Sequence, residues 1–277
     1  MMTHPRSILI TGASSGIGQA TARHFLAQGW QVAATMRQPE KDQALGEQAN
    51  LLKLRLDVEE PATVQAALQT CVATFGRLDV LLNNAGYGSA GPLEAASDEQ
   101  IRRQFEVNLF GLIDVIRAAL PILREQRSGL IMNVSSIGGL VAFPLFSLYH
   151  ASKWAVEGLT ESLQFELNPL GIKLKLIEPG GVHTDFAGRS LDMFDASAYP
   201  DYQPTLAKLL AHFAPDGERA SRRSTAAAIA AGIYEAATDG KDQLRYVLGA
   251  DAQQTWTQRQ AVPYETFREG VRQLMLG

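Results

Sequence analysis

The sequence predicts an α/β fold, a doubly wound parallel sheet of about seven strands with helices on both faces. Three observations support this prediction. Short apolar runs alternate with longer segments of helical periodicity along most of the chain. The runs are apolar almost throughout, as in strands that are buried on both faces. A glycine-rich turn joins the first run to the first helical segment, and sheets of this kind bind ligands beyond the carboxyl ends of their strands.

The expected elements follow one another in a regular order. The strands are Ser7–Ile10, Gln31–Thr35, Leu51–Leu56, Leu78–Asn83, Gly129–Val134, Ile172–Ile177 and Leu244–Leu248. The helices lie near Gly16–Gln28, Pro61–Phe75, Asp98–Arg124, Tyr149–Leu167 and Thr225–Ala237. No linker or internal repeat divides the chain, so we expect one domain over residues 1–277. The long irregular stretch over about residues 183–224 is interpreted as a substrate-binding lid.

Composition and charge argue against several classes of protein. Hydrophobic residues make up 46% of the 277 residues and charged residues 19%, which is typical of a folded protein with a sizeable core. A net charge of −4 without any Lys/Arg-rich stretch argues against nucleic-acid binding. No apolar run approaches the roughly 18 residues that cross a bilayer, so we expect no membrane span. No signal-peptide core precedes the first strand, and we expect a cytoplasmic protein.

Cysteine and histidine usage indicates neither a disulfide nor a metal site. Cys71 is the only cysteine, so an intrachain disulfide is impossible, in agreement with a reducing compartment. It lies in an apolar stripe of helical spacing, and we expect a buried structural thiol rather than a nucleophile. The five histidines are scattered without paired ligand spacing, so no metal is expected.

The turn after the first strand suits phosphate binding. Glycines occupy positions 12, 16 and 18, a Gly-x3-Gly-x-Gly spacing. Glycine permits a tight turn and a close approach of the backbone to a ligand. The free N–H groups at the start of a helix attract negative charge, so we expect this turn to hold the pyrophosphate of a dinucleotide. An ordinary glycine-rich strand–helix turn is the alternative interpretation.

Tyr149 and Lys153 are four residues apart in an expected helix, so their side chains share a face. A free phenol loses its proton near pH 10. A neighbouring ammonium favours the phenolate and lowers the pKa of the phenol, which turns it into a usable acid/base. A helix that carries tyrosine for packing and lysine for solubility is the commoner explanation of an isolated match. The prediction therefore depends on several motifs occurring together.

Such motifs do occur together, and in a fixed order. They are Thr11-Gly12-x3-Gly16-Ile17-Gly18, Asn83-Asn84-Ala85-Gly86, Asn108, Ser136, Tyr149-x3-Lys153 and Pro179-Gly180. In this order they resemble the short-chain dehydrogenase/reductase family over roughly residues 6–250, and they imply its Rossmann-type sheet. The segments Ala34–Arg37 and Glu178–Gly180 make the chain similar to the branch that contains retinol and 17β-hydroxysteroid dehydrogenases.

The resemblance implies four catalytic residues. Tyr149 would exchange a proton with the substrate oxygen while a hydride moves between the nicotinamide and the substrate carbon. Lys153 would bind the nicotinamide ribose and lower the tyrosine pKa. Ser136, with Ser135 as the neighbouring candidate, would hydrogen-bond the substrate oxygen, and Asn108 would hold a water that connects Lys153 to solvent. A loop cap for the serine and a surface position for the asparagine are the alternatives.

The cofactor contacts implied by the resemblance lie at the ends of the strands and in the catalytic motif. They are Gly12, Ser14, Ser15, Gly16, Ile17, Gly18, Arg37, Asp57, Val58, Asn84, Ala85, Gly86, Asn108, Tyr149, Lys153, Pro179, Gly180, Val182 and Thr184. An acidic residue at the end of the second strand would accept hydrogen bonds from the ribose of NAD. This chain has Met36 followed by Arg37 there, and a forked guanidinium suits a 2′-phosphate, so NADP(H) is favoured over NAD(H). A solvated loop charge is the alternative for Arg37.

The expected substrate is a mainly apolar carbonyl compound or alcohol of medium size. The apolar segment Leu140–Phe146 lies between the serine and the tyrosine, and the lid carries Met193, Phe194, Tyr199, Tyr202, Leu206, Leu209 and Phe213. Packing of the lid onto its own domain explains these side chains equally well. The helix after Tyr149 carries small residues at Ala151, Ala155, Gly158 and Ser162. By resemblance they favour a homodimer or homotetramer, and intramolecular packing is the alternative.

Two rival functions remain open at this stage. One is a regulatory protein that binds NADP(H) without turnover. The set Asn108, Ser136, Tyr149 and Lys153 argues against it, because sensing needs no proton relay. The other is an epimerase or dehydratase of nucleotide sugars, which the N-terminal glycine spacing and the modest C-terminal region disfavour.

Overall fold

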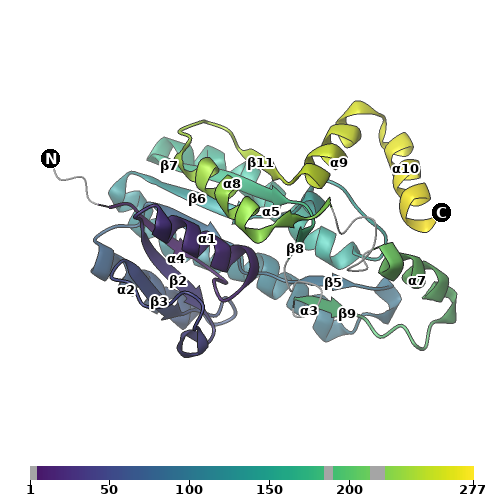
Figure 1. Ribbon diagram of the computed structural model, residues 1–277, viewed down its shortest axis with the longest axis horizontal. Helices are drawn as coiled ribbons and strands as arrows, with labels where there is room; N and C mark the ends of the chain where they lie inside the picture. The colour runs from purple at the N-terminus through teal and green to yellow at the C-terminus, as the bar shows by residue number, and fades with distance from the viewer. Residues whose placement is uncertain (1–4, 184–189, 213–221) are drawn as a thin grey trace.

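The computed structural model describes residues 5–183, 190–212 and 222–277. Within these residues the centre of the molecule is a parallel sheet with the strand order β11-β7-β6-β4-β1-β2-β3 (Figure 1). Its strands are β1 (Ser7–Ile10), β2 (Gln31–Met36), β3 (Leu51–Arg55), β4 (Val80–Asn83), β6 (Gly129–Val134), β7 (Ile172–Pro179) and β11 (Arg245–Leu248). The predicted fold class is confirmed.

The strand order reverses at β1, which pairs with β2 on one side and with β4 on the other. Ile8 stands opposite Val32 of β2 and Val80 of β4. In open α/β sheets ligands bind beyond the carboxyl ends of the strands at such a reversal. Thr11 and Asn84 follow β1 and β4 directly, so the glycine-rich turn and the Asn-Ala-Gly run meet at this point.

Helices cover both faces of the sheet. One face carries α1 (Gly16–Ala27) and α8 (Ala226–Thr238), and the other carries α2 (Pro61–Phe75), α4 (Gly111–Gln126) and α5 (Ser147–Leu167) (Figure 1). Successive strand residues point to opposite faces. Ile8 and Ile10 therefore join the core beneath α1 and α8, while Leu9 joins the other core. Cys71 of α2 is fully buried in that second core as predicted, and burial raises the pKa of its thiol to about 12.

The helix expected over Asp98–Arg124 is not continuous. It consists of α3 (Asp98–Phe105), a π turn (Glu106–Phe110) and α4. Ser97 caps α3 with a capping box in which Gln100 is the partner. At the start of α4 the backbone packs so closely on α2's entry loop that a Cβ at Gly111 would lie 2.7 Å from Val58 Cβ. Periodicity does not reveal such a π turn, because the apolar stripe continues through it.

The segment interpreted as a lid is described over residues 190–212. It contains β9 (Leu191–Met193), a 3₁₀ turn (Pro200–Tyr202) and α7 (Gln203–His212). The short strand β9 pairs in parallel with β5 (Gly88–Ala90), which follows the Asn-Ala-Gly run. A second two-stranded pair joins β8 (Val182–His183) to β10 (Ser224–Thr225). Thr184 and Phe213 lie outside the described residues.

Two helices that the sequence patterns did not predict end the chain. They are α9 (Ala250–Ala261) and α10 (Tyr264–Leu276), and with α7 they form the end of the molecule opposite the N-terminus (Figure 1). A third apolar cluster holds them in place. In it Ala252 of α9 and Phe267 of α10 pack with Ile137 and Val141 from the loop after β6. Among the described helices, none is both long and apolar enough to cross a membrane.

Candidate active site

The glycine-rich turn adopts the backbone conformations that its sequence predicted. Gly12 and Gly16 have φ values of 68° and 56°, in the left-handed region that favours glycine. Gly18, in the first turn of α1, has no room for a side chain, because a Cβ there would lie 2.3 Å from the Gly12 carbonyl oxygen and 2.5 Å from Asn84 Nδ2. Nothing bulkier than glycine fits at this join, and the start of the helix stays open to a ligand. The turn therefore fits a pyrophosphate.

Thr11 and Asn84 lock this turn to the end of β4. The Thr11 hydroxyl accepts hydrogen bonds from the N–H groups of Asn84 at 2.9 Å and Ala85 at 3.0 Å. In return, Asn84 Nδ2 donates to the carbonyl oxygens of Thr11 at 2.9 Å and Gly12 at 3.1 Å. Sequence reasoning placed Asn84 at the cofactor but gave Thr11 no role. The structure makes the two residues one unit that orients the turn.

Tyr149 and Lys153 lie on one face of α5, as their spacing predicted. The Lys153 ammonium is 5.9 Å from the centre of the Tyr149 ring, and the ring is half-buried. Lys153 itself is only 6% exposed, and its Nζ donates a 2.9 Å hydrogen bond to the Val134 carbonyl oxygen at the end of β6. A Cβ at Gly86 would lie 3.6 Å from Lys153 Nζ, so the Asn-Ala-Gly run also borders the ammonium.

The pKa of Tyr149 differs from the expected direction. Burial raises the pKa of the phenol above its usual range of about 10, and a hydrogen bond with the Ser136 side chain acts against this rise. Burial also lowers the pKa of Lys153 to about 8, opposed by the negative charge of Glu157. For Tyr149, desolvation thus outweighs the hydrogen bond with Ser136, and the pKa of the phenol rises. Tyr149 is consequently protonated at neutral pH.

Ser136 stands where the sequence placed it, next to the phenol. It precedes a 3₁₀ turn (Ile137–Gly139), and its Oγ accepts a 3.0 Å hydrogen bond from the Gly138 N–H. Ser136 therefore caps the loop, which was the alternative interpretation, and it also contacts Tyr149. Ser135 is buried and points elsewhere, toward the space beside Glu157, because a Cβ at Gly139 would meet both side chains within 2.8 Å.

His150 holds the loop between the serine and the tyrosine in place. Its Nδ1 lies 2.8 Å from the Gly138 carbonyl oxygen, and its Nε2 accepts a 2.9 Å hydrogen bond from the Phe143 N–H. This pattern requires the neutral ring with its proton on Nδ1. Burial lowers the pKa of His150 to about 4. The sequence gave a weak signal for this residue, since it neighbours Tyr149, but contacts across the loop cannot be derived from spacing.

Asn108 lies in the π turn and is almost fully buried, which excludes the surface alternative. Its Nδ2 donates to the Tyr87 carbonyl oxygen at 2.8 Å and to Ser152 Oγ at 3.1 Å, and its Oδ1 accepts from the Tyr87 N–H at 3.0 Å. A Cβ at Gly86 would lie 3.1 Å from that Oδ1. The asparagine thus fixes the strand end that borders Lys153.

The other predicted cofactor contacts line the same edge of the sheet. Arg37 is exposed directly after β2, whereas Met36 before it is buried. Asp57 and Val58 follow β3, with Asp57 Oδ1 accepting a 3.1 Å hydrogen bond from the Glu59 N–H. Pro179 ends β7. Of the remaining described contacts, Ser14 and Gly86 are exposed and Gly18 is buried. The others are partly exposed, and they are Gly12, Ser15, Gly16, Ile17, Asn84, Ala85, Gly180 and Val182.

The side chains of the segment interpreted as a lid were expected either to face the substrate or to pack onto their own domain, and they differ in burial. Phe194 and Leu209 are buried in packing, and Phe194 fills the space beside Gly91, where a Cβ would lie 2.8 Å from Phe194 Cβ. Met193 is 36% exposed. Tyr202 donates a 3.0 Å hydrogen bond to the Glu94 carboxylate. Part of the lid therefore packs onto its own domain.

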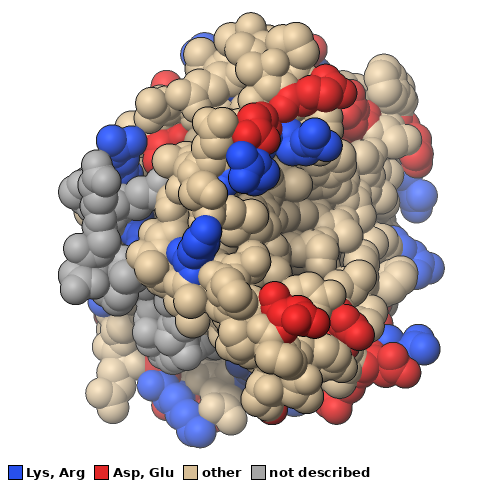
Figure 2. All heavy atoms as spheres, turned by 90° about the vertical axis from the view of Figure 1, so that its right-hand side faces the viewer, with Lys and Arg blue, Asp and Glu red and all other residues tan. Residues whose placement is uncertain are grey.

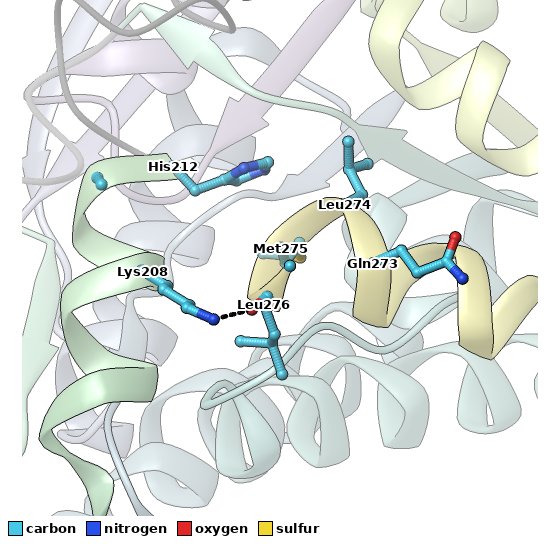
Figure 3. A pocket seen from close by; sticks show the side chains of 8 residues that line it. Lys208, His212, Gln273, Leu274, Met275 and Leu276 are labelled. Carbon is cyan, nitrogen blue, oxygen red and sulfur yellow. Dashed lines mark hydrogen bonds between the residues drawn. The ribbon is translucent and has the colours of Figure 1, made fainter.

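A separate cavity of about 470 Å³ opens between α7 and α10 (Figure 3). Lys208 and His212 reach into it from α7, and Lys208 Nζ hydrogen-bonds the Leu276 carbonyl oxygen. None of its lining residues belongs to the predicted catalytic set. Figure 2 shows this end of the molecule, where acidic and basic side chains are scattered around a hollowed, largely uncharged centre.

Comparison with known proteins assigns the class of protein that this fold and site define. The family described as short chain dehydrogenase matches residues 6–193. An uncharacterised oxidoreductase of Schizosaccharomyces pombe is 39% identical over 237 residues, which are 84% of this chain and 96% of that protein. Retinol dehydrogenase 8 of Bos taurus is 39% identical over 215 residues, 74% of this chain and 68% of that one. The chain belongs to the short-chain dehydrogenase/reductase family.

Solved structures agree with this assignment over nearly the whole chain. A short-chain dehydrogenase from Streptomyces avermitilis has a TM-score of 0.81 at 32% identity, and the match covers 99% of this chain and 97% of that one. A Burkholderia cenocepacia short chain dehydrogenase in complex with NADP has a TM-score of 0.75 at 25% identity and full coverage of both chains. A Burkholderia phymatum member in complex with NAD has a TM-score of 0.74 at 27% identity, covering 94% and 95%. The protein is thus a nucleotide-binding oxidoreductase of this family.

Proposed function

We propose that the protein is an NADP(H)-dependent oxidoreductase that interconverts a mainly apolar carbonyl compound and its alcohol. The observation that carries this proposal is the contact of the protonated Tyr149 phenol with Ser136, beside the buried ammonium of Lys153. When bound, the nicotinamide supplies or accepts the hydride. The chain's own residues would then bind the substrate oxygen and move one proton.

Tyr149 is assigned the proton transfer. The phenol is protonated at neutral pH, and burial raises its pKa further, so it suits donation to the oxygen that gains charge during carbonyl reduction. Ser136 would donate a hydrogen bond to the same oxygen and stabilise its charge. Lys153 would orient the nicotinamide ribose and favour the phenolate that the proton transfer leaves behind. Asn108 would hold the neighbouring strand end and a water that resupplies the proton.

The preference for NADP(H) is proposed from the end of β2. Arg37 is exposed there, and no acidic side chain stands at the position that would accept ribose hydrogen bonds. A guanidinium binds a phosphate in a forked, charge-assisted contact. Ser15, partly exposed before α1, would add a hydroxyl donor. One structural relative binds NADP and another NAD, so the family permits both choices.

An apolar substrate and a twofold assembly complete the proposal. The loop over Leu140–Phe146 would border the substrate together with the lid around residues 183–224. On the outer side of α5, Trp154 and Phe165 are 52% and 77% exposed beside small exposed residues. Such a face suits close packing against the same helix of a second copy, so we propose a homodimer or homotetramer.

The test measures NADPH consumption against a panel of ketones, aldehydes and quinones, and the reverse reaction with alcohols and NADP. The wild-type protein should oxidise NADPH with at least one apolar carbonyl compound. Tyr149→Phe should bind NADPH normally but turn over about 100- to 10,000-fold more slowly, the usual contribution of general acid catalysis. NADPH binding without turnover across the whole panel would favour the regulatory alternative, and near-normal rates of the variant would remove Tyr149 as the proton donor.

A further inference from the structure

A buried acid pair joins α5 to the sheet and takes no part in the mechanism proposed above. Glu157 of α5 and Glu178 of β7 are 5% and 0% exposed. Both bind the same nitrogen, Nη1 of Arg245 in β11, with the Glu178 oxygen at 3.0 Å. The other terminal nitrogen of Arg245 pairs with the exposed Glu161 at 3.1 Å. Two carboxylates that share one nitrogen lie too close together for both to be ionised readily.

One proton on this pair resolves the conflict. Burial, and then the neighbouring charge of Glu157, raises the pKa of Glu178 to about 8, so Glu178 is protonated at neutral pH. Burial also raises the pKa of Glu157, but Ser135, Arg245 and Lys153 all act to keep this carboxylate charged. The pair therefore shares one proton, and the charges around Glu157 favour the anion on α5.

The anion lies on the catalytic face of α5. Tyr149, Lys153 and Glu157 follow one another at intervals of four residues, so they form one row along the helix. Lys153 is buried with a carbonyl oxygen as its hydrogen-bond partner, and burial alone favours its neutral form. A negative charge one helical turn away, in surroundings that exclude water, opposes this loss of charge.

We propose that Glu157 is the counter-charge that keeps Lys153 protonated, while Glu178 carries the proton of the buried pair. Glu157 is thus a positioning residue that acts through Lys153, and the inference rests on the role of Lys153 in the proposed function. The charged and titratable groups that face Glu157 are Lys153 on α5, Glu178 on β7 and Arg245 on β11, and the uncharged Ser135 hydroxyl hydrogen-bonds it. Glu161 of α5 binds the same arginine.

The test compares the pH dependence of carbonyl reduction in matched variants. Reduction needs Lys153 in its charged form, so kcat/KM should fall as pH rises through the pKa of this group. Glu157→Gln removes the counter-charge, lowers that pKa and should move the descending limb to lower pH by about one unit. Below about pH 8, Glu178→Gln replaces a neutral acid by a neutral amide, so it should move the limb much less than Glu157→Gln does. Glu161→Gln removes the exposed partner of Arg245 and serves as the control for that ion pair.

The affinity for NADPH, measured by fluorescence between pH 6 and 9, tests the same inference without turnover. In Glu157→Gln the pH at which binding weakens should fall by the same amount, and Glu157→Asp, which keeps the charge, should restore it to within about 0.3 units of wild type. An unmoved limb in folded Glu157→Gln, or an equal shift in Glu161→Gln, would overturn the inference. A wild-type protein that binds NADPH but reduces nothing would instead count against the proposed function alone, since the binding readout still decides the role of Glu157.

Discussion

The carboxylate of Asp251 accepts a 2.7 Å hydrogen bond from the backbone N–H of Gly181, which joins the first turn of α9 to the turn after β7. A Cβ at Gly180 would lie 2.3 Å from Asp251 Oδ1, so the carboxylate rests directly against this turn. The match to the family ends at residue 193. A residue beyond the matched part of the chain therefore shapes the turn to which we assign the nicotinamide.

We expect Asp251→Ala to loosen this turn. The loss of a charge-assisted hydrogen bond to backbone should cost about 1–3 kcal/mol, which corresponds to roughly a 5- to 150-fold weaker affinity if the turn must reorder on binding. Isothermal titration with NADPH measures this loss. Asp242→Ala removes an exposed aspartate that pairs with Lys173 at 3.2 Å and should leave the affinity unchanged. An equal affinity in both variants would show that the turn is ordered without Asp251.

Arg37→Ala tests the assignment of the phosphate-bearing cofactor. Losing a guanidinium contact to phosphate should weaken NADPH binding about 10- to 100-fold, with NADH binding nearly unchanged. Dissociation constants for both cofactors provide the measurement. Arg55→Ala is the matched control, because Arg55 is also exposed at the end of a neighbouring strand and pairs with Glu60 at 2.8 Å. An unchanged ratio of the two affinities in Arg37→Ala would contradict the NADP(H) preference.

Comparing Gly18→Ala with Gly270→Ala should separate the steric cost of a side chain at the turn from the gain in helix propensity that alanine brings. The added methyl would enter the space of the Gly12 carbonyl oxygen and Asn84 Nδ2, so the turn must shift. We expect a loss of about 1–3 kcal/mol in the free energy of unfolding, as for other overpacked sites, and at least a tenfold loss of NADPH affinity. Gly270→Ala in α10 meets nothing within 4 Å and should instead stabilise the protein by about 0.5–1 kcal/mol. Urea denaturation distinguishes the two, and a neutral Gly18→Ala would refute the steric argument.

His150 should make the protein sensitive to mild acid. Its pKa falls from 6.5 to about 4 on folding, so the unfolded chain binds the proton more strongly. The contribution of neutral His150 to stability is complete above pH 6.5, the pKa of the group in the unfolded chain. It is lost as pH falls from 6.5 toward 4. Between pH 7 and pH 5 the free energy of unfolding should decrease by about 2 kcal/mol through this group. Urea denaturation of His150→Gln should show a smaller decrease over this interval, whereas the exposed His183→Gln should follow the wild type.

The main elements could be predicted because their causes are local. Strand β1 spans the apolar run that predicted it. Helix α2 begins at Pro61 and ends before Gly76, since proline suits the first turn of a helix and glycine its left-handed end. The short strands β5 and β9 could not be predicted, because each exists only through pairing with the other. Helix α9 shows only weak helical periodicity, whereas α10 carries Phe267, Val271 and Met275 at intervals of four residues and was missed despite this pattern. The apolar loop near Ile137 supplies the packing partners of both helices.

The sequence by itself determined the sheet, the phosphate turn and the row of residues along α5, because glycine stereochemistry and helical spacing are properties of neighbouring residues. Tertiary structure alone decided the direction of the pKa shifts in the site. Burial raises the pKa of Tyr149, against the expectation from its spacing to Lys153, and it lowers the pKa of Lys153. The reason is that desolvation depends on what surrounds a group in three dimensions, and the elements that enclose these two side chains come from distant parts of the chain.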